Sequence, residues 1–346
     1  MTKNVVLNKS LPKPKISIIV PVKKINNYLR RETIPAILNQ TCKNFEIIIL
    51  SDTESKEKFF KTKIIPTWPK TGPADKRDIG AKKAKGKILA FLDDDSYPDK
   101  NWLKNAIKIF QESNKISAVC GPTLTPSHNN LRQKASGYVW STWLGSGGAG
   151  TYRCTIAERQ EVDDYPTVNF LVRKKDFLAV NGFNSHFWPG EDTKLCLDLT
   201  KKLGKKIIYD PKVLVYHHRR EVFRPHLKQI SRYAIHRGHF ARVLPQTSFR
   251  IGYFIPAFFV LGLIGGSILI FLLEIFQFCT VSISLLFLYL FSIFLYLLAL
   301  LITAIQVYLK EKNFKLALLI IPSIFATHFI YGALFIKGFF SPKLNR

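Results

Sequence analysis

Three long apolar runs at the end of the chain limit its fold more than any other feature of the sequence. They cover residues 251–273, 281–308 and 315–337, and each is long enough to cross ~30 Å of hydrocarbon as a helix. Helices in the core of a soluble protein are rarely so uniformly apolar. We therefore expect residues 250–346 to form a membrane domain with about three transmembrane helices.

The sequence before the apolar runs predicts on which side of the membrane the N-terminal domain lies. Residues 1–14 form a polar leader, and the short apolar run that follows is too short for a signal peptide. The cysteines are isolated, without a Cys-x-x-Cys pair, which indicates a reducing compartment and no cysteine-based structural zinc; they are Cys42, Cys120, Cys154, Cys196 and Cys279. We expect a cytoplasmic domain over residues 15–222, at the face of the cell membrane.

The third apolar run gives conflicting signals about its own crossing. The lysines between the second and third runs obey the positive-inside rule if they are cytoplasmic. A third crossing then places Lys337, Lys343 and Arg346 outside, against the same rule. We expect a full crossing because the run supplies the ~20 residues that a span requires; the alternative is a segment that dips into the membrane and returns.

The strongly basic composition has two possible explanations. The chain has 51 Lys and Arg against 24 Asp and Glu, and the excess lies in the first 250 residues. We find no zinc-finger spacing, RNA-recognition signature or basic helix with interleaved aromatics, so we expect no nucleic-acid partner. A domain on the anionic cytoplasmic leaflet that handles phosphorylated substrates accounts for the charge. Residues 223–249 are then a basic interfacial helical linker rather than a solvated one.

Strand and helix patterns alternate through the first 220 residues. Apolar runs at 16–22 and 45–50 flank a helical pattern at 27–40, which predicts a βαβ unit and an α/β sheet that is at least partly parallel. Further strands are expected at 64–66, 88–92, 116–120, 168–172, 206–209 and 213–216. Residues 123–166 look irregular, and we expect their glycine-rich segment 145–150 to be a flexible acceptor-side loop. A phosphate cradle fits less well, because no Gly-Lys-Ser/Thr follows.

Three consecutive carboxylates, Asp93, Asp94 and Asp95, follow the expected strand at 88–92. Adjacent carboxylates repel each other, so such a cluster implies either a bound cation or a turn solvated by water. Ligands of open α/β sheets collect at the carboxyl ends of strands, where Mg²⁺ or Mn²⁺ binds through carboxylates and substrate phosphates. The sequence therefore predicts a metal–diphosphate site.

An ordered set of motifs resembles the family-2 glycosyltransferases over roughly residues 14–250. The set comprises residues 17–22, Ser51-Asp52, 77–86, 91–95, Gly182-Phe183 and Gly190-Glu191-Asp192. The resemblance implies a GT-A fold, Rossmann-like with a mostly parallel sheet flanked by helices, followed here by an all-α transmembrane region. It also implies inverting transfer of a sugar from a nucleotide-diphospho-sugar with Mg²⁺ or Mn²⁺. Residues 229–233 and the C-terminal spans are similar to enzymes of exopolysaccharide, succinoglycan-type or lipid-linked glycan synthesis.

The resemblance also implies roles for individual residues. Asp93, Asp95 and His217 would hold the metal, with His218 as the alternative histidine. Asp192 would be the catalytic base, with Glu191 as the alternative. The donor would meet the ends of the first strands and the following helix, through Pro21, Val22, Asp52, Lys76, Arg77 and Asp94. Gln229, Arg232 and Tyr233 would belong to an acceptor or donor loop.

Several departures from the family pattern qualify these expectations. Val22-Lys23-Lys24 stands where the family often has Tyr-Asn-Glu, which bears on the identity of the donor. The Gln229-x-x-Arg232-Tyr233 sequence only approximates the Gln-x-x-Arg-Trp of processive synthases, so we expect one sugar to be added at a time. The alternatives are a nucleotidyl- or phosphosugar-transferase, and a membrane scaffold without enzymatic activity.

Overall fold

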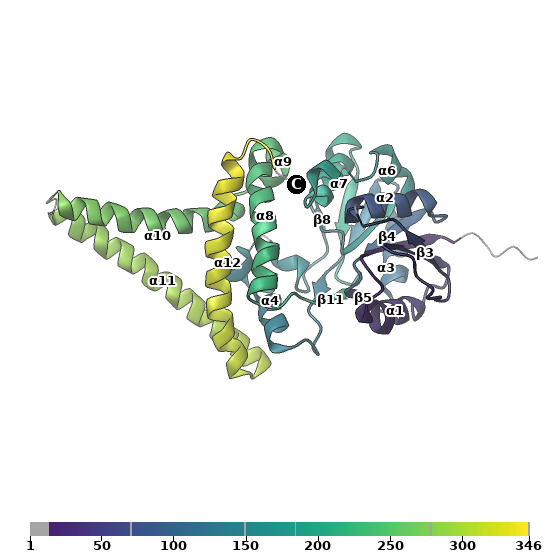
Figure 1. The fold of residues 1–346 in the computed structure, drawn as a ribbon, viewed down its shortest axis with the longest axis horizontal. Helices are drawn as coiled ribbons and strands as arrows, with labels where there is room; N and C mark the ends of the chain where they lie inside the picture. The colour runs from purple at the N-terminus through teal and green to yellow at the C-terminus, as the bar shows by residue number, and fades with distance from the viewer. Residues whose placement is uncertain (1–13, 70, 149, 184, 277–278, 345–346) are drawn as a thin grey trace, which may run out of the picture.

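The computed structural model describes residues 14–344, except residues 70, 149, 184, 277 and 278. Nearly all of the expected leader therefore lies outside the described residues. An α/β domain carries a long helical region, and an apolar helical hairpin projects away from the α/β domain (Figure 1).

The central sheet has eight strands in the order β3-β2-β1-β4-β9-β6-β10-β8. Parallel pairing joins β3, β2, β1 and β4, and also β6 and β10, whereas β9 and β8 run antiparallel to their neighbours. The bounds are β1 Ile16–Val22, β2 Phe45–Ser51, β3 Thr62–Pro66, β4 Ile88–Leu92, β6 Ile116–Cys120, β8 Gln160–Val162, β9 Asn169–Arg173 and β10 Lys206–Tyr209. The predicted α/β sheet, mostly parallel, is confirmed.

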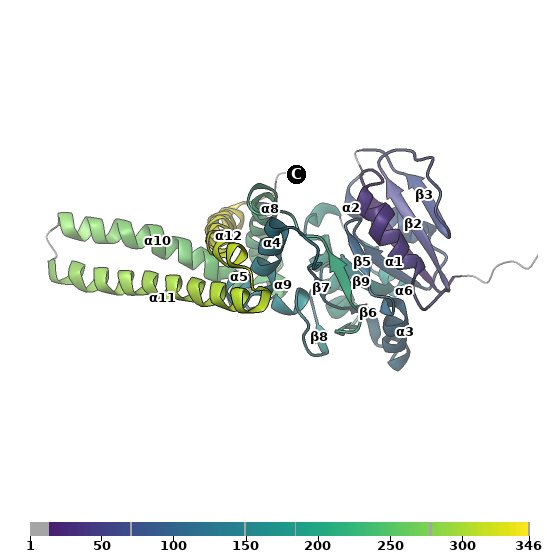
Figure 2. The same ribbon diagram turned by 90° about the horizontal axis from the view of Figure 1, so that it is seen from below.

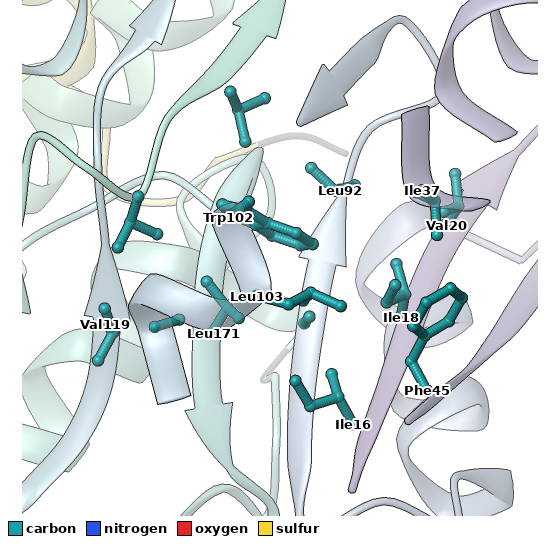
Figure 3. Close-up of a cluster of buried hydrophobic side chains, with 14 of the residues drawn as sticks. Ile16, Ile18, Val20, Ile37, Phe45, Leu92, Trp102, Leu103, Val119 and Leu171 are labelled. Atoms are coloured by element: carbon teal, nitrogen blue, oxygen red, sulfur yellow. The ribbon is translucent and has the colours of Figure 1, made fainter. Parts of the chain in front are cut away.

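Helices cover both faces of this sheet, and successive strand residues point to opposite faces. Ile18 and Val20 of β1 pack toward α1 (Ile34–Leu38) and α3 (Trp102–Glu112), as Figure 3 shows. Ile19 packs on the other face, which α2 (Pro73–Lys83), α6 (Lys174–Ala179) and α7 (Glu191–Leu197) cover. Each fully buried Ile or Leu contributes about 1.5–3 kcal/mol, so the two faces hold the strand ends rigidly.

A second, three-stranded sheet lies at the carboxyl end of the large one. It has the order β5-β11-β7, with β5 Ser96–Pro98, β7 Thr123–Leu124 and β11 Val215–His217. Antiparallel pairing of β11 with β5 sets His217 opposite Ser96. The strand following the three aspartates is therefore fixed by a strand from the far end of the domain.

The segment expected to be irregular, residues 123–166, contains regular structure. Helix α4 (Leu131–Ser141) begins with a capping box between Asn130 and Gln133, a local signal that the sequence carries. Helix α5 (Trp143–Ser146) ends at Gly147, whose positive φ of 64° suits a glycine, and a short 3₁₀ turn, η2, follows at Thr151–Arg153. The helix expected at 27–40 is divided into a π turn, η1 (Leu29–Thr33), and α1, where Pro35 removes a backbone donor.

Five helices form the C-terminal part of the chain: α8 Arg224–Val243, α9 Pro245–Ser248, α10 Ile251–Ile275, α11 Cys279–Glu311 and α12 Phe314–Phe340. The last three are long and apolar enough to cross a membrane. In both views α10 and α11 form the projecting hairpin, and α12 runs crosswise to it, beside α8 (Figures 1 and 2). Whether residues 223–249 are interfacial stays a prediction.

Candidate active site

The turn after β4 brings two of the three aspartates together with a histidine. Ligand atoms of Asp93, Asp95 and His217 all lie within 4.8 Å of one another. His217 Nε2 is 3.2 Å from Asp95 Oδ1. Burial by itself would raise the pKa of Asp95, but the adjacent His217 brings it below the usual value. The structure thus assembles the three residues expected to bind a metal.

The chemistry of this group suits a hard divalent cation. Two carboxylates are the donors that Mg²⁺ and Mn²⁺ prefer, and an imidazole nitrogen completes the set. The Asp93 and Asp95 side chains are about one third exposed, which leaves room for a substrate beside them. Arg219 Nη1 lies 3.3 Å from His217 Nδ1, so Nε2 carries the proton toward Asp95 and a bound cation would replace that proton.

Asp94 points away from this group. Its Oδ2 accepts a hydrogen bond of 2.6 Å from Asn26 Nδ2, which lies between β1 and η1. Burial, followed by the charges of Asp95 and Asp93, raises the pKa of Asp94 to about 7. Asp94 therefore fixes the turn against the β1 loop, and Asn26 is a site residue that the sequence analysis missed.

His218 also lies outside the Asp93 and Asp95 group. Its Nδ1 is 2.6 Å from Asn129 Oδ1, and its Nε2 is 3.0 Å from Glu32 Oε2. His218 is buried, and its ring stacks on Tyr28. Between the two histidines, the geometry favours His217 as the partner of the aspartates.

Four of the six residues expected to bind the donor meet at the carboxyl ends of β1 and β2, namely Pro21, Val22, Asp52 and Lys76. Lys76 Nζ donates to the Val22 carbonyl at 2.6 Å and pairs with the Asp52 carboxylate. The parallel register of Val22 with Ser51 places these strand ends side by side. Because a Cβ at Gly80 would lie 2.7 Å from Ile19, glycine there lets α2 approach the sheet and bring Lys76 over both strands. Lys76 is thus paired with Asp52 and is not a free cation that faces the diphosphate of a donor.

Arg77 joins two acidic motifs that are far apart in the sequence. Its Nη2 is 2.7 Å from Asp93 Oδ1, and its Nη1 is 3.4 Å from Glu191 Oε1. The guanidinium also lies over the Phe183 ring, at 5.9 Å from the ring centre. The Nε of this buried side chain has no partner among the described residues. One buried cation therefore connects the metal-site turn with the start of α7.

Glu191 and Asp192 occupy the first turn of α7 and differ in surroundings. Burial and then the charge of Asp192 raise the pKa of Glu191 to about 8. Burial and then the charge of Asp164 raise the pKa of Asp192 to about 6. Glu191 is directed to Arg77, whereas Asp192 accepts a hydrogen bond of 2.8 Å from Thr193 N. Both carboxyls thus ionise at higher pH than usual.

A buried aspartate behind Asp192 was missed as a site residue. Asp164 Oδ1 accepts from Thr193 Oγ1 at 2.9 Å, and its Oδ2 lies 3.1 Å from Arg153 and 3.4 Å from Arg237. Burial acts to raise the pKa of Asp164, but Arg237 and Arg153 together lower it to about 2. No local pattern links Asp164 to Arg237, because α8 supplies Arg237 from outside the α/β domain.

Helix α8 brings the expected acceptor-loop residues close to the start of α7. The Arg232 guanidinium lies 5.8 Å from the centre of the Trp188 ring, just before Gly190. Gln229 Nε2 donates to the Tyr233 hydroxyl at 3.2 Å. Desolvation by burial, and more weakly the charges of Asp192 and Asp93, raise the pKa of Tyr233.

Comparison with known proteins identifies the domain that carries these residues. The sequence model described as Glycosyl transferase family 2 matches residues 17–179, which include Lys76, Arg77 and the aspartate turn. Residues 17–179 belong to glycosyl transferase family 2. The mostly parallel sheet with helices on both faces is the GT-A arrangement that the resemblance implied. Glu191, Asp192 and His217 lie beyond the matched region and reach the site through the fold.

Individual relatives match parts of the chain. An uncharacterized glycosyltransferase of Rickettsia bellii is 38% identical over 110 residues, covering 30% of this chain and 16% of that protein. One of Haemophilus influenzae is 27% identical over 201 residues, covering 54% and 62%. A glucosyl-dolichyl phosphate glucuronosyltransferase of Haloferax volcanii is 20% identical over 223 residues, covering 59% and 69%. The chain thus spans less than two thirds of the length of the first two relatives.

Proposed function

We propose that the protein transfers a sugar, with inversion, from a nucleotide-diphospho-sugar to a hydroxyl group of a lipid-linked or polysaccharide acceptor. The reaction takes place at the cytoplasmic face of the cell membrane and adds one sugar at a time. The observation that carries this proposal is the position of Arg77 between Asp93 and Glu191, which joins the metal-site turn and the motif of the catalytic base.

In this proposal Asp93, Asp95 and His217 hold Mg²⁺ or Mn²⁺ against the diphosphate of the donor. The metal, when bound, would neutralise the charge that develops on the departing nucleoside diphosphate. Arg77 adds a fixed positive charge beside Asp93. Asp52, held by Lys76 at the end of β2, would accept hydrogen bonds from the nucleobase. Pro21 and Val22 would line the same end of the sheet.

Asp192 is the proposed base. Its carboxylate takes the proton of the acceptor hydroxyl, while the acceptor oxygen forms a bond to the anomeric carbon of the sugar. The bond from that carbon to the diphosphate oxygen breaks on the opposite side, so the configuration inverts. The raised pKa of about 6 strengthens Asp192 as a proton acceptor yet leaves it ionised at neutral pH. Glu191, which faces Arg77, is better suited to positioning.

The acceptor is proposed from the surroundings of the base. Helix α8 carries Arg232 to Trp188, just before the motif of the base, and it is followed in the chain by α9 and the apolar helices. The name of the Haloferax relative refers to transfer to a dolichyl phosphate carrying glucose, which supports an acceptor attached to a lipid. The apolar hairpin would keep the site near the membrane that holds such an acceptor.

A ligand screen followed by product analysis tests the proposal. Purified full-length protein is heated with UDP-, GDP- and dTDP-sugars in the presence of Mg²⁺ or Mn²⁺. A donor at ~100 times its dissociation constant should add about 2.7 kcal/mol to the free energy of unfolding. With an extract of membrane glycolipids, the stabilising donor should release a nucleoside diphosphate and label a lipid.

The products separate this function from its alternatives. Release of pyrophosphate or a nucleoside monophosphate would identify a nucleotidyl- or phosphosugar-transferase instead. Absence of metal-dependent stabilisation by every nucleotide-sugar would support a scaffold without enzymatic activity. The Asp192→Asn variant serves as the control, because it should be stabilised by the same donor but should not transfer the sugar.

A further inference from the structure

Helix α12 packs closely against α8 along the C-terminal half of α12. A Cβ at Gly238 of α8 would lie 2.1 Å from the Phe335 carbonyl, and a Cβ at Gly338 of α12 would lie 2.0 Å from the Ile235 carbonyl. The two backbones therefore touch at a pair of glycines. Nearer the start of α8, His226 Nε2 lies 3.0 Å from Thr327 Oγ1.

The N-terminal half of α12 packs on α4, a helix that precedes α8 in the chain. Leu316 and Ile320 share a buried cluster with Ala135 and Val139 of α4. Farther along, His328 Nε2 lies 3.0 Å from the Leu144 carbonyl at α5. Helices α4, α5 and α8 thus accompany α12 over most of its length.

The charge of α8 makes a transmembrane position for this assembly costly. Basic side chains follow one another along the helix: Arg224, Lys228, Arg232, Arg237 and Arg242. An arginine or lysine at the centre of a membrane-spanning helix costs ~2.5–3.5 kcal/mol. If α12 crossed the bilayer, α8 would have to enter the hydrocarbon beside it, with several of these charges.

The face of α12 that is turned away from α4 and α8 is apolar. Phe314, Leu318, Phe325 and Phe340 are between 41% and 72% exposed, and their spacing follows one side of the helix. The exposed lysines Lys315 and Lys337 lie near the two ends of this face. An apolar stripe flanked by cations is typical of a helix lying in the surface of an anionic membrane.

The apolar surface of the α10–α11 hairpin continues from the apolar face of α12. This continuity indicates that a membrane covers both. Helix α10 crosses α12 at Gly332, where a Cβ would lie 2.0 Å from the Pro256 carbonyl. Beyond Val260, which also contacts Gly332, residues 261–275 extend about 22 Å at 1.5 Å per residue. A hydrocarbon core of ~30 Å then leaves α12 ~8 Å deep, which matches the 5–10 Å depth of interfacial helices.

We propose that α12 lies in the plane of the cytoplasmic membrane surface and that, of the described helices, only α10 and α11 cross the bilayer. The chain then returns to the cytoplasm before α12, and Lys337 and Lys343 stay on the side that the positive-inside rule prefers. The expectation of a third crossing rested on length, whereas this proposal rests on what α12 contacts. The two topologies predict opposite locations for the C-terminus.

Thiol labelling of intact cells separates the two topologies. In a Cys279→Ser background, Phe276→Cys at the end of α10 should react with an impermeant reagent in intact cells, because this exposed end of the hairpin is external. In a Cys279→Ser background, a cysteine placed directly after Leu344 (Asn345→Cys) should react only after permeabilisation. The Cys279→Ser protein alone gives the background of the remaining cysteines.

Each result of this experiment bears on the proposal. Labelling of the Asn345→Cys protein in intact cells would overturn it in favour of a third crossing. Failure of the Phe276→Cys protein to react in intact cells would overturn the crossing hairpin from which the depth of α12 follows. Labelling of the Asn345→Cys protein only after permeabilisation, combined with labelling of the Phe276→Cys protein in intact cells, supports the in-plane helix.

A depth measurement distinguishes a membrane-bound α12 from one that stays in water. Phe314→Cys, Phe325→Cys and Phe340→Cys, each in the Cys279→Ser background, carry a fluorophore in vesicles of phosphatidylcholine and phosphatidylglycerol. Nitroxide-labelled lipids should quench the fluorophores at all three positions, and the three fluorophores should lie at the same shallow depth. Deepest quenching at position 325 would indicate a crossing helix, and quenching at none of the three would indicate a helix in water; either result overturns the proposal. Donor-induced thermal stabilisation of each variant shows that it is folded.

Discussion

Asp95 and His217 lie side by side, with Oδ1 and Nε2 3.2 Å apart, although they come from distant parts of the sequence. The pairing of β11 with β5 sets His217 opposite Ser96, so backbone hydrogen bonds fix the distance. A preorganised pair of this kind can receive a cation without rearrangement of the chain.

Replacement of Asp95 by alanine should abolish turnover and the metal-dependent part of donor binding. The site has few protein ligands, so loss of one carboxylate leaves the diphosphate charge uncompensated. Thermal shifts with donor, with and without Mn²⁺, measure the effect. Glu161→Gln, which removes an exposed carboxylate, is the control and should behave as wild type. Wild-type donor affinity in Asp95→Ala would refute the assignment.

Replacement of Asp192 by asparagine should lower the transfer rate by about 100-fold or more while donor affinity stays nearly unchanged. The reason is that a base acts on the acceptor proton and contributes little to ground-state binding of the donor. Initial rates and donor titrations test this prediction. If Glu191→Gln loses the transfer step and Asp192→Asn keeps it, the base is Glu191.

The pH dependence of kcat/KM should have an ascending limb with an apparent pKa near 6. Burial raises the pKa of Asp192 to about 6, so the carboxyl is protonated and inactive as a base below that pH. The rate should therefore fall about tenfold per pH unit on the acid side and level off above it. Rates at saturating metal check this, and the limb should be absent from the residual activity of Asp192→Asn.

Replacement of Arg77 by methionine should destabilise the protein by about 3 kcal/mol, because it leaves the buried carboxyl group of Glu191 without the cation beside it. Arg77 and Glu191 have side chains that are 6% and 7% exposed. The double variant Arg77→Met/Glu191→Gln should recover part of the stability but not the activity. Thermal unfolding and transfer assays of the four proteins measure the coupling. Additive losses, in which Glu191→Gln costs the same stability in the wild type and in Arg77→Met, would show that the pair is not coupled.

Replacement of Gly238 by alanine should destabilise the protein by about 1–3 kcal/mol, as expected for overpacking. The added Cβ would lie 2.1 Å from the Phe335 carbonyl, so α8 and α12 would have to separate. Gly262→Ala in α10 is the matched control, since a Cβ there meets nothing within 4 Å. Thermal unfolding in detergent compares the two variants. Similar unfolding of both would contradict the close packing of α8 on α12.

The sequence by itself determined the main elements and the position of the aspartates. The apolar runs of β1, β2, β4 and β6 identify buried strands, and the length of α10 and α11 identifies helices that suit a membrane, because both signals are local. The same signals place Asp93 and Asp95 at the carboxyl end of a strand. The regular structure of residues 123–166 was missed, since only the Asn130 capping box marked it.

Tertiary structure alone decided which groups meet. Arg77 faces Glu191 and Asp164 faces Arg237 because helices distant in the chain are placed over the same strand ends. The length and apolar content of α12 likewise did not determine its position, because they fit either a crossing helix or an in-plane helix. Its contact with α8 depends on Gly238 and Gly338 meeting across two helices. Contacts between remote segments follow from register and close packing, which no local pattern encodes.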